Sequence, residues 1–177
     1  MSVKIRIGGS VGVRDFLDDE RLRAFGEPAR ITVWPHEGAL LCIGDLETLL
    51  RIVERDGWCH VEKQDRGGQW RELMRTEQLA VARRFVLWEV GGWVRSAANR
   101  GLATRSPEPE LRAGFTLTED GDEVVLSWHE AGAARSARML GGIWRSKAVR
   151  FSAYADLPED AILARFGGPP VTGFGAR

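Results

Sequence analysis

The feature that most constrains how this chain folds is a long apolar segment in its middle, residues 76–102. The first part of this segment reads TEQLAVARRFVLWEVGG and would place apolar side chains on nearly every side of a helix. Four polar residues interrupt that surface: Gln78, Arg83, Arg84 and Glu89. A helix that is apolar all round has to be buried, so other segments of the chain must cover most of it.

Both ends of this helix carry local signals. We expect Thr76 to be the N-cap, because a threonine hydroxyl can accept a hydrogen bond from a backbone N–H of the first turn. We expect Gly91-Gly92 to end the helix or to let a neighbouring backbone approach closely. Trp93 and Val94 can add another turn.

The residues before this helix predict strands joined by tight turns. Alternating apolar residues at positions 3–7 predict a half-buried strand, and helical spacing at positions 13–25 predicts a short helix. Residues 30–34 and 39–43 are apolar or β-branched runs on either side of turn residues, which indicates an antiparallel hairpin.

A second hairpin is predicted from residues 51–53 and 58–61, because Asp56-Gly57 between them suits a type I′ turn. An alternative stays open at this point, in which Asp45 caps a helix that runs through Val53. Residues 65–69 are then expected to form a polar, glycine-containing loop.

The second half of the chain predicts a meander of strands. An exposed loop is expected at residues 106–110, where two prolines cannot donate to a sheet. Strands are expected around Phe115 and Leu117, at residues 124–128 and at residues 135–140, with glycine-containing turns between them.

A short helix near the C-terminus follows the meander. Asp156 and Glu159 have the spacing of a capping box and predict a helix through Phe166, and an extended tail is expected from residue 167 on. The predicted fold class is therefore α+β, a mostly antiparallel sheet of hairpins packed on one long central helix, with short N- and C-terminal helices. We expect one domain spanning residues 1–177.

Composition narrows the classes of function. Lysine plus arginine and aspartate plus glutamate both number 25, so the formal net charge is zero and favours neither nucleic acid nor a membrane surface as partner. Cys42 and Cys59 lie in apolar runs without metal-ligand spacing, which indicates buried, reduced thiols and a cytoplasmic protein. The N-terminus lacks a signal-peptide pattern, and no run is long and apolar enough to suggest a membrane span.

One catalytic motif has to be weighed. Residues 8–12 read GGSVG and match G-x-S-x-G, with Ser10 in the nucleophile position, so a small serine hydrolase is the alternative function. A hydrolase of that type needs parallel βαβ units, whereas this chain predicts antiparallel hairpins. The three histidines, His36, His60 and His129, are scattered, so neither a metal site nor a cofactor is expected.

A resemblance to a known family rests on two segments in fixed order. The run RFVLWEVGGWVRS at residues 84–96, followed by FSAYADL at residues 151–157, resembles an immunity-protein family that includes the antidote of the tuberculosis necrotizing toxin. The similarity runs from about Leu49 to Phe166, the first 48 residues match poorly, and Gly167-Gly168-Pro169-Pro170 replaces the family's usual ending. The resemblance implies that residues 151–157 form a strand before the last helix.

The resemblance also implies what the protein does. It implies a non-enzymatic inhibitor that binds a cognate protein toxin and occludes its active site; the best-known relative acts on an NAD-degrading glycohydrolase. The contact residues that we expect lie in polar loops and contain tryptophan or arginine, which are enriched at binding hot spots: Arg66, Gln69, Trp70, Arg95, Arg100, Trp144 and Arg145.

Structural roles for some of these residues remain open. Trp70 and Trp144 can instead cap the core, and Arg95 can pair with Glu89 or bind carbonyl groups at the end of its own helix.

Overall fold

The computed structural model of the protein describes residues 20–98, 110–140 and 144–167. The strand predicted at residues 3–7 and the motif around Ser10 lie outside these ranges, as do residues 106–109 of the predicted loop and residues 168–177 of the predicted tail. The described residues form an α+β fold in which an antiparallel sheet packs on one long helix, as the sequence predicts.

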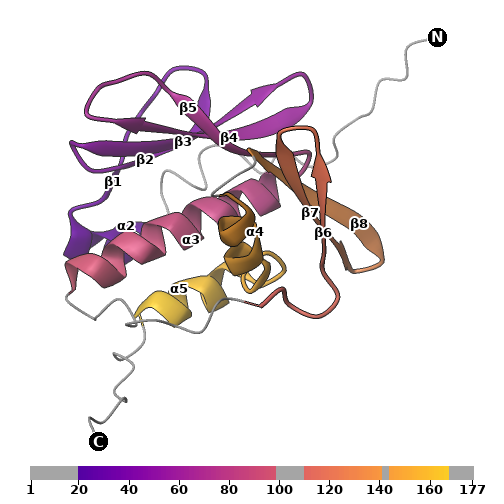
Figure 1. The fold of residues 1–177 in the computed structure, drawn as a ribbon. Coiled ribbons are helices and arrows are strands. Elements are labelled where there is room, and N and C mark those ends of the chain that lie inside the picture. Colours follow the sequence, from indigo (N-terminus) through magenta and orange to yellow (C-terminus); the bar gives the residue numbers. More distant parts are fainter. Residues whose placement is uncertain (1–19, 99–109, 141–143, 168–177) are drawn as a thin grey trace, which may run out of the picture.

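The sheet contains eight strands in the order β1-β2-β3-β4-β5-β8-β7-β6, and every neighbouring pair is antiparallel (Figure 1). The strands are β1 (Thr32–Val33), β2 (Ala39–Gly44), β3 (Thr48–Arg55), β4 (Trp58–Asp65), β5 (Arg71–Thr76), β6 (Thr116–Asp120), β7 (Glu123–Glu130) and β8 (Ala133–Leu140). The helices are α2 (Glu20–Gly26), a 3-10 turn η1 (Glu27–Ala29), α3 (Leu79–Ala97), α4 (Trp144–Ser152) and α5 (Glu159–Gly167).

The predicted hairpins are present because their turns contain the residues that such turns need. Asp56 and Gly57 both have positive φ, 52° and 80°, as a type I′ turn requires, and Ala131-Gly132 repeats this with 51° and 79°. The alternative helix capped by Asp45 is wrong, since its residues form β3. The Asp45 carboxylate instead accepts hydrogen bonds from the backbone N–H groups of Glu47 and Thr48 in the turn before that strand.

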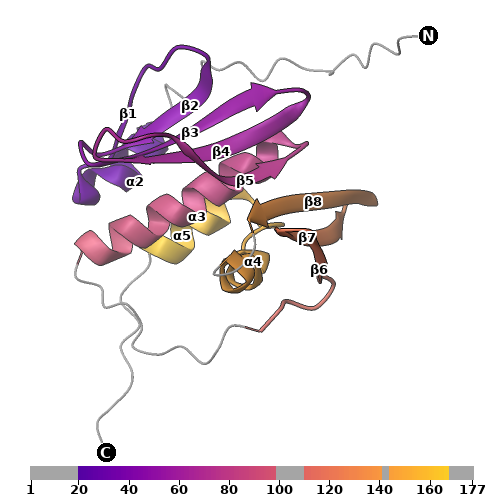
Figure 2. The same ribbon diagram turned by 45° about the horizontal axis from the view of Figure 1, so that its top comes forward.

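The sequence predicts that the central helix α3 ends at Gly91-Gly92, but the helix continues to Ala97. Position 91 requires a glycine because another segment approaches the helix closely there, and it does so with a side chain and not with its backbone. A methyl group at Gly91 would lie 2.3 Å from the ring of Phe166 in α5. Figure 2 shows α5 lying along α3 on the side away from the sheet.

Thr76 is not the N-cap of α3, which is Gln78. Thr76 is instead the buried last residue of β5, and its hydroxyl donates to the carbonyl of Ser136 in β8 at 2.7 Å. The same hydroxyl accepts a hydrogen bond from the backbone N–H of Gln78 at 3.3 Å, so Thr76 contacts both the start of α3 and β8. The junction of β5 with β8 holds the two halves of the sheet together.

Residues 144–152 form the helix α4, whereas Trp144 and Arg145 were expected in a polar loop, and the strand implied for residues 151–157 is absent. Ala148 and Phe151 of α4 and Ala155 in the turn after it are fully buried, and the helix packs mainly against β7 and β8. The Phe151 ring meets the Phe85 ring of α3 edge to face at 5.1 Å between centroids.

The last helix, α5, begins at Glu159, two residues later than Asp156 as N-cap and Glu159 as the third helical residue would predict. Asp156 forms an ion pair with Arg112. Glu159 binds Arg83 of α3 at 2.8 Å, so the acidic residues at the start of this helix bind other segments of the fold.

Gly91→Ala is expected to lower the free energy of unfolding by about 1–3 kcal/mol, because the added methyl group has to displace the ring of Phe166. Gly92→Ala is the matched control in the same turn, since nothing lies within 4 Å of the position that its methyl group would take. It should raise the free energy of unfolding by about 0.5–1 kcal/mol through helix propensity alone. Urea denaturation measures both; effects of equal sign and size would contradict the packing of Phe166 on α3.

Candidate functional site

The two faces of the β2–β5 part of the sheet differ sharply. Leu50 and Ile52 of β3 and Val61 of β4 point to the face that packs against α3 and are fully buried. Arg51, between Leu50 and Ile52, and Glu62, next to Val61, are opposite each other on the other face of the sheet. We call this face the outer face. Figures 1 and 2 show the helices on the side of the sheet opposite to the outer face.

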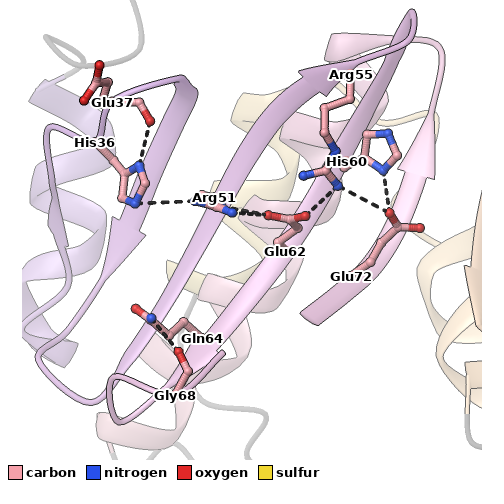
Figure 3. A network of polar contacts seen from close by, with 9 residues as sticks. All are labelled: His36, Glu37, Arg51, Arg55, His60, Glu62, Gln64, Gly68 and Glu72. Carbon is pink, nitrogen blue, oxygen red and sulfur yellow. Dashed lines mark hydrogen bonds and ion pairs between the residues drawn. The ribbon is translucent and has the colours of Figure 1, made fainter. Parts of the chain in front are cut away.

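A network of arginines and carboxylates crosses the outer face (Figure 3). At its centre, Glu62 accepts hydrogen bonds from Arg51 Nε at 2.7 Å and from Arg55 Nη2 at 2.6 Å. Burial alone would raise the pKa of the Glu62 carboxyl, but the hydrogen bonds and positive charges of the two arginines outweigh it, so the pKa lies below its ordinary value. Glu62 is therefore a charged anchor that fixes both guanidinium groups.

The network continues towards β5 and β8. Glu72 of β5 accepts a hydrogen bond from His60 Nδ1 and lies 3.8 Å from Arg55 Nη2. Arg75 then binds Glu123 of β7 at 2.7 Å. These contacts connect the two halves of the sheet on the outer face, above the junction of β5 with β8.

Tryptophan side chains border the same network. The Arg51 guanidinium lies over the Trp70 ring at 4.1 Å from its centroid, and His36 meets that ring edge to face at 5.6 Å between centroids. The centroid of the Trp58 ring lies 5.6 Å from the guanidinium carbon of Arg75 and 6.0 Å from that of Arg138. Such cation–π contacts hold the planar arginine groups in place.

One group of the residues predicted for toxin contact lies at a corner of the outer face. Arg66 and Gln69 are exposed in the loop between β4 and β5, where Arg66 has a left-handed φ of 50° and lies 3.6 Å from Glu47. Trp70 closes this loop against Arg51. It is half-buried, so it both covers part of the sheet and offers surface to a partner.

The other predicted residues lie elsewhere. Arg95 is in α3, where its Nη2 donates to the backbone carbonyl of Arg165 in α5 at 2.7 Å. The proposed contacts of Arg95 with Glu89 or with its own helix are therefore not those observed, because α5 lies alongside and Glu89 binds Lys147.

Arg145 is exposed in α4 and binds Glu119 of β6 at 3.0 Å, and Trp144 is the first residue of that helix. Arg100 lies outside the described ranges. The six predicted residues that the structure describes thus lie in three different parts of it.

The sequence reasoning missed the arginines and carboxylates of β3 and β4, although a signal was present. Once a two-residue turn is placed at Asp56-Gly57, residue numbers that sum to 113 lie opposite each other, which pairs Arg51 with Glu62. Opposite charges on paired residues of one face would have pointed to this network.

Both cysteines of the chain lie in the described ranges and are buried. Cys42 and Cys59 are unpaired thiols, and burial raises the pKa of both, which disfavours the reactive thiolate. His60 points to the outer face and Cys59 to the core, so they do not form a nucleophile and base. Among the described residues there is no group of three or more histidine, cysteine or acidic side chains placed to hold a metal ion.

No helix within residues 20–98, 110–140 and 144–167 has the length and apolarity needed to cross a membrane. The antiparallel order of the sheet also differs from the parallel βαβ units that the serine-hydrolase alternative requires.

Glu62→Gln is expected to lower the free energy of unfolding by about 3 kcal/mol at pH 7, because Arg51 and Arg55 lose the charge that they share. The folded-state pKa of Glu62 is lowered, so its stabilising contribution is present above pH 4.5 and is lost as pH falls through the folded pKa. The difference between variant and wild type should therefore shrink in acid.

Urea denaturation at pH 7 and at acidic pH measures this difference. Glu54→Gln, at the exposed end of the neighbouring strand β3, is the control and should change the stability by less than about 0.5 kcal/mol. A difference between Glu62→Gln and wild type that keeps its size in acid would contradict the role of Glu62 as the charged anchor of the network.

Comparisons with known proteins give this fold and surface a context. A family model described as Immunity protein 61 matches residues 25–169, so residues 25–48, which we expected to match poorly, belong to the shared region. The solved structure of Rv3902c from M. tuberculosis matches with a TM-score of 0.65 and 17% identity, over 84% of this chain and 87% of that chain, which shows a shared fold. A search of curated proteins found no match. The predicted resemblance is confirmed: the chain belongs to the immunity protein 61 family, and its role is that of a toxin-neutralising immunity protein.

Proposed function

We propose that this protein neutralises its cognate toxin by binding it directly and occluding its active site, without catalysis of its own. The observation that carries this proposal is the family match over residues 25–169, since immunity proteins act on toxins. Its support from the structure is a rigid sheet whose outer face carries arginine and tryptophan, the residue types enriched at binding hot spots.

The geometry of the outer face suits tight binding. Inhibition of a toxin inside the cell that makes it requires nanomolar affinity or better, which corresponds to about −12 kcal/mol and an interface of about 1,600 Å². Strands and their hydrogen-bonded side chains keep such a surface in one conformation, which reduces the ordering entropy lost on binding.

We further propose that the toxin is an NAD-degrading glycohydrolase and that neutralisation takes place in the cytoplasm, where the NAD pool would be attacked. Support for this comes from the resemblance to the family of the tuberculosis necrotizing toxin antidote and from the fold shared with Rv3902c. The predicted contact residues remain proposals, and Trp70 is the one that lies against the outer-face network.

Co-expression tests the proposed function. The toxin encoded by the gene adjacent to this one should stop growth and deplete cellular NAD when expressed alone, and co-expression of this protein should restore both. The two proteins should also co-purify and form a complex of defined stoichiometry on size-exclusion chromatography.

Separate outcomes count against separate parts of the proposal. Growth arrest with normal NAD levels, rescued by this protein, would refute the NAD-degrading toxin and keep the immunity role. Rescue without a complex, retained at low protein concentration, would refute occlusion and indicate that the protein acts on the toxin's products. A toxin variant without catalytic activity should bind as well as the active toxin does.

A further inference from the structure

We propose that the outer face of β3, β4 and β5, centred on Arg55 and bordered by Trp58 and Trp70, docks the toxin, and that the toxin presents an acidic patch to it. This proposal rests on the proposed function, because it names the surface and the partner chemistry of the same interaction. The exposure and the geometry of the arginine–carboxylate network carry it.

The arginines Arg51, Arg55 and Arg75 of the network are more exposed than the carboxylates that they bind. The side chain of Arg55 is 47% exposed, whereas those of its partners Glu62 and Glu72 are 7% and 27% exposed. Arg75 is 36% exposed and its partner Glu123 is 17% exposed. The formal charges largely cancel, but the carboxylates lie below and the guanidinium groups above, so solvent or a partner meets mainly hydrogen-bond donors.

Arg55 has donors to offer. Its hydrogen bond to Glu62 and its ion pair with Glu72 both run through Nη2. A guanidinium carries five N–H donors in a planar fork, which binds a carboxylate with two parallel hydrogen bonds. The Nε and Nη1 groups of this half-exposed side chain point to different sides of the guanidinium, so each is suited to one hydrogen bond with a carboxylate of the toxin.

The boundary of this donor-rich surface can be located at the far side of β8. There Arg138 binds Asp120 of β6, and the order of exposure is reversed, with 29% for the arginine and 64% for the aspartate. An acidic partner would be repelled at that end and attracted over β3–β5. This difference in charge favours one position and one orientation of the toxin on the sheet.

The aromatic border supplies the rest of a hot spot. Trp58 and Trp70 are half-buried, so each offers part of a large apolar ring beside a fixed guanidinium. Arginine groups held against aromatic rings and carboxylates lose little conformational entropy on binding. Apolar contact with these rings would exclude water from the ion pairs that Arg55 forms with the toxin.

The test compares charge-reversed variants in binding to a catalytically inactive form of the toxin domain encoded by the adjacent gene. Arg55→Glu should weaken binding by about 100-fold or more, because it places a carboxylate opposite the acidic patch. Arg55→Gln, which is less disruptive to Glu62, should weaken it by about 10-fold. Wild-type affinity should fall as salt concentration rises, and the affinity of Arg55→Glu should depend less on salt.

Arg150→Glu is the matched control, since Arg150 is an exposed arginine on α4, away from the sheet face. It should bind the toxin domain within about twofold of wild type. Circular dichroism and thermal unfolding establish whether each variant is folded. If Arg55→Glu does not fold, the binding of Arg55→Gln tests the proposal.

Several results would overturn the proposal. Wild-type binding that survives in both Arg55 variants, while substitution of Arg95 or Arg145 abolishes it, would move the docking surface to α3 and α5 or to α4. A self-associating protein whose dimer is dissolved by Arg55→Glu, with toxin binding unchanged, would assign the face to a second copy. If the wild type does not bind the toxin domain at all, the proposed function fails, and this proposal with it.

Discussion

The described structure depends on the burial of α3. Phe85 and Leu87 are both buried although they lie on nearly opposite sides of this helix, so the sheet has to cover one side and α5, together with Phe151 of α4, another. The charged residues of the helix serve the same arrangement: Arg83 binds Glu159 in α5, Arg84 binds Glu130 in β7, and Glu89 binds Lys147 in α4. Each charge on the helix thus attaches one of the segments that cover its apolar surface.

This arrangement determines where function can reside. The described helices gather on the side of α3, and within the described ranges no helix covers the opposite face of β2–β5, where the arginine–carboxylate network lies (Figure 2). Antiparallel register places Arg51 opposite Glu62 and Arg55 opposite Trp58, so the network is built into the strand pairing and is as rigid as the sheet. A surface of this kind can bind tightly with little reorganisation.

The sequence predicted the parts of this fold that have local causes. The Asp56-Gly57 and Ala131-Gly132 turns specify their hairpins through backbone conformation, and the apolar run of α3 specifies a buried helix. The sequence did not predict the features that depend on contacts between distant residues. Gly91 leaves room for the ring of Phe166, and Thr76 donates a hydrogen bond to β8; the local sequence pattern identifies neither partner. The outer-face network was missed for the same reason, since its signal lies in the pairing of two strands.

The measurement that tests the central claim most directly is hydroxyl-radical footprinting of the tryptophans with and without the inactive toxin domain. Trp58 and Trp70 border the outer face, and Trp93 lies in α3 on the helical side of the fold. We expect the toxin to reduce the oxidation of Trp58 and Trp70 and to leave that of Trp93 unchanged. Protection of Trp93 with unchanged oxidation of Trp58 and Trp70 would contradict docking on the outer face and place the toxin on the helices.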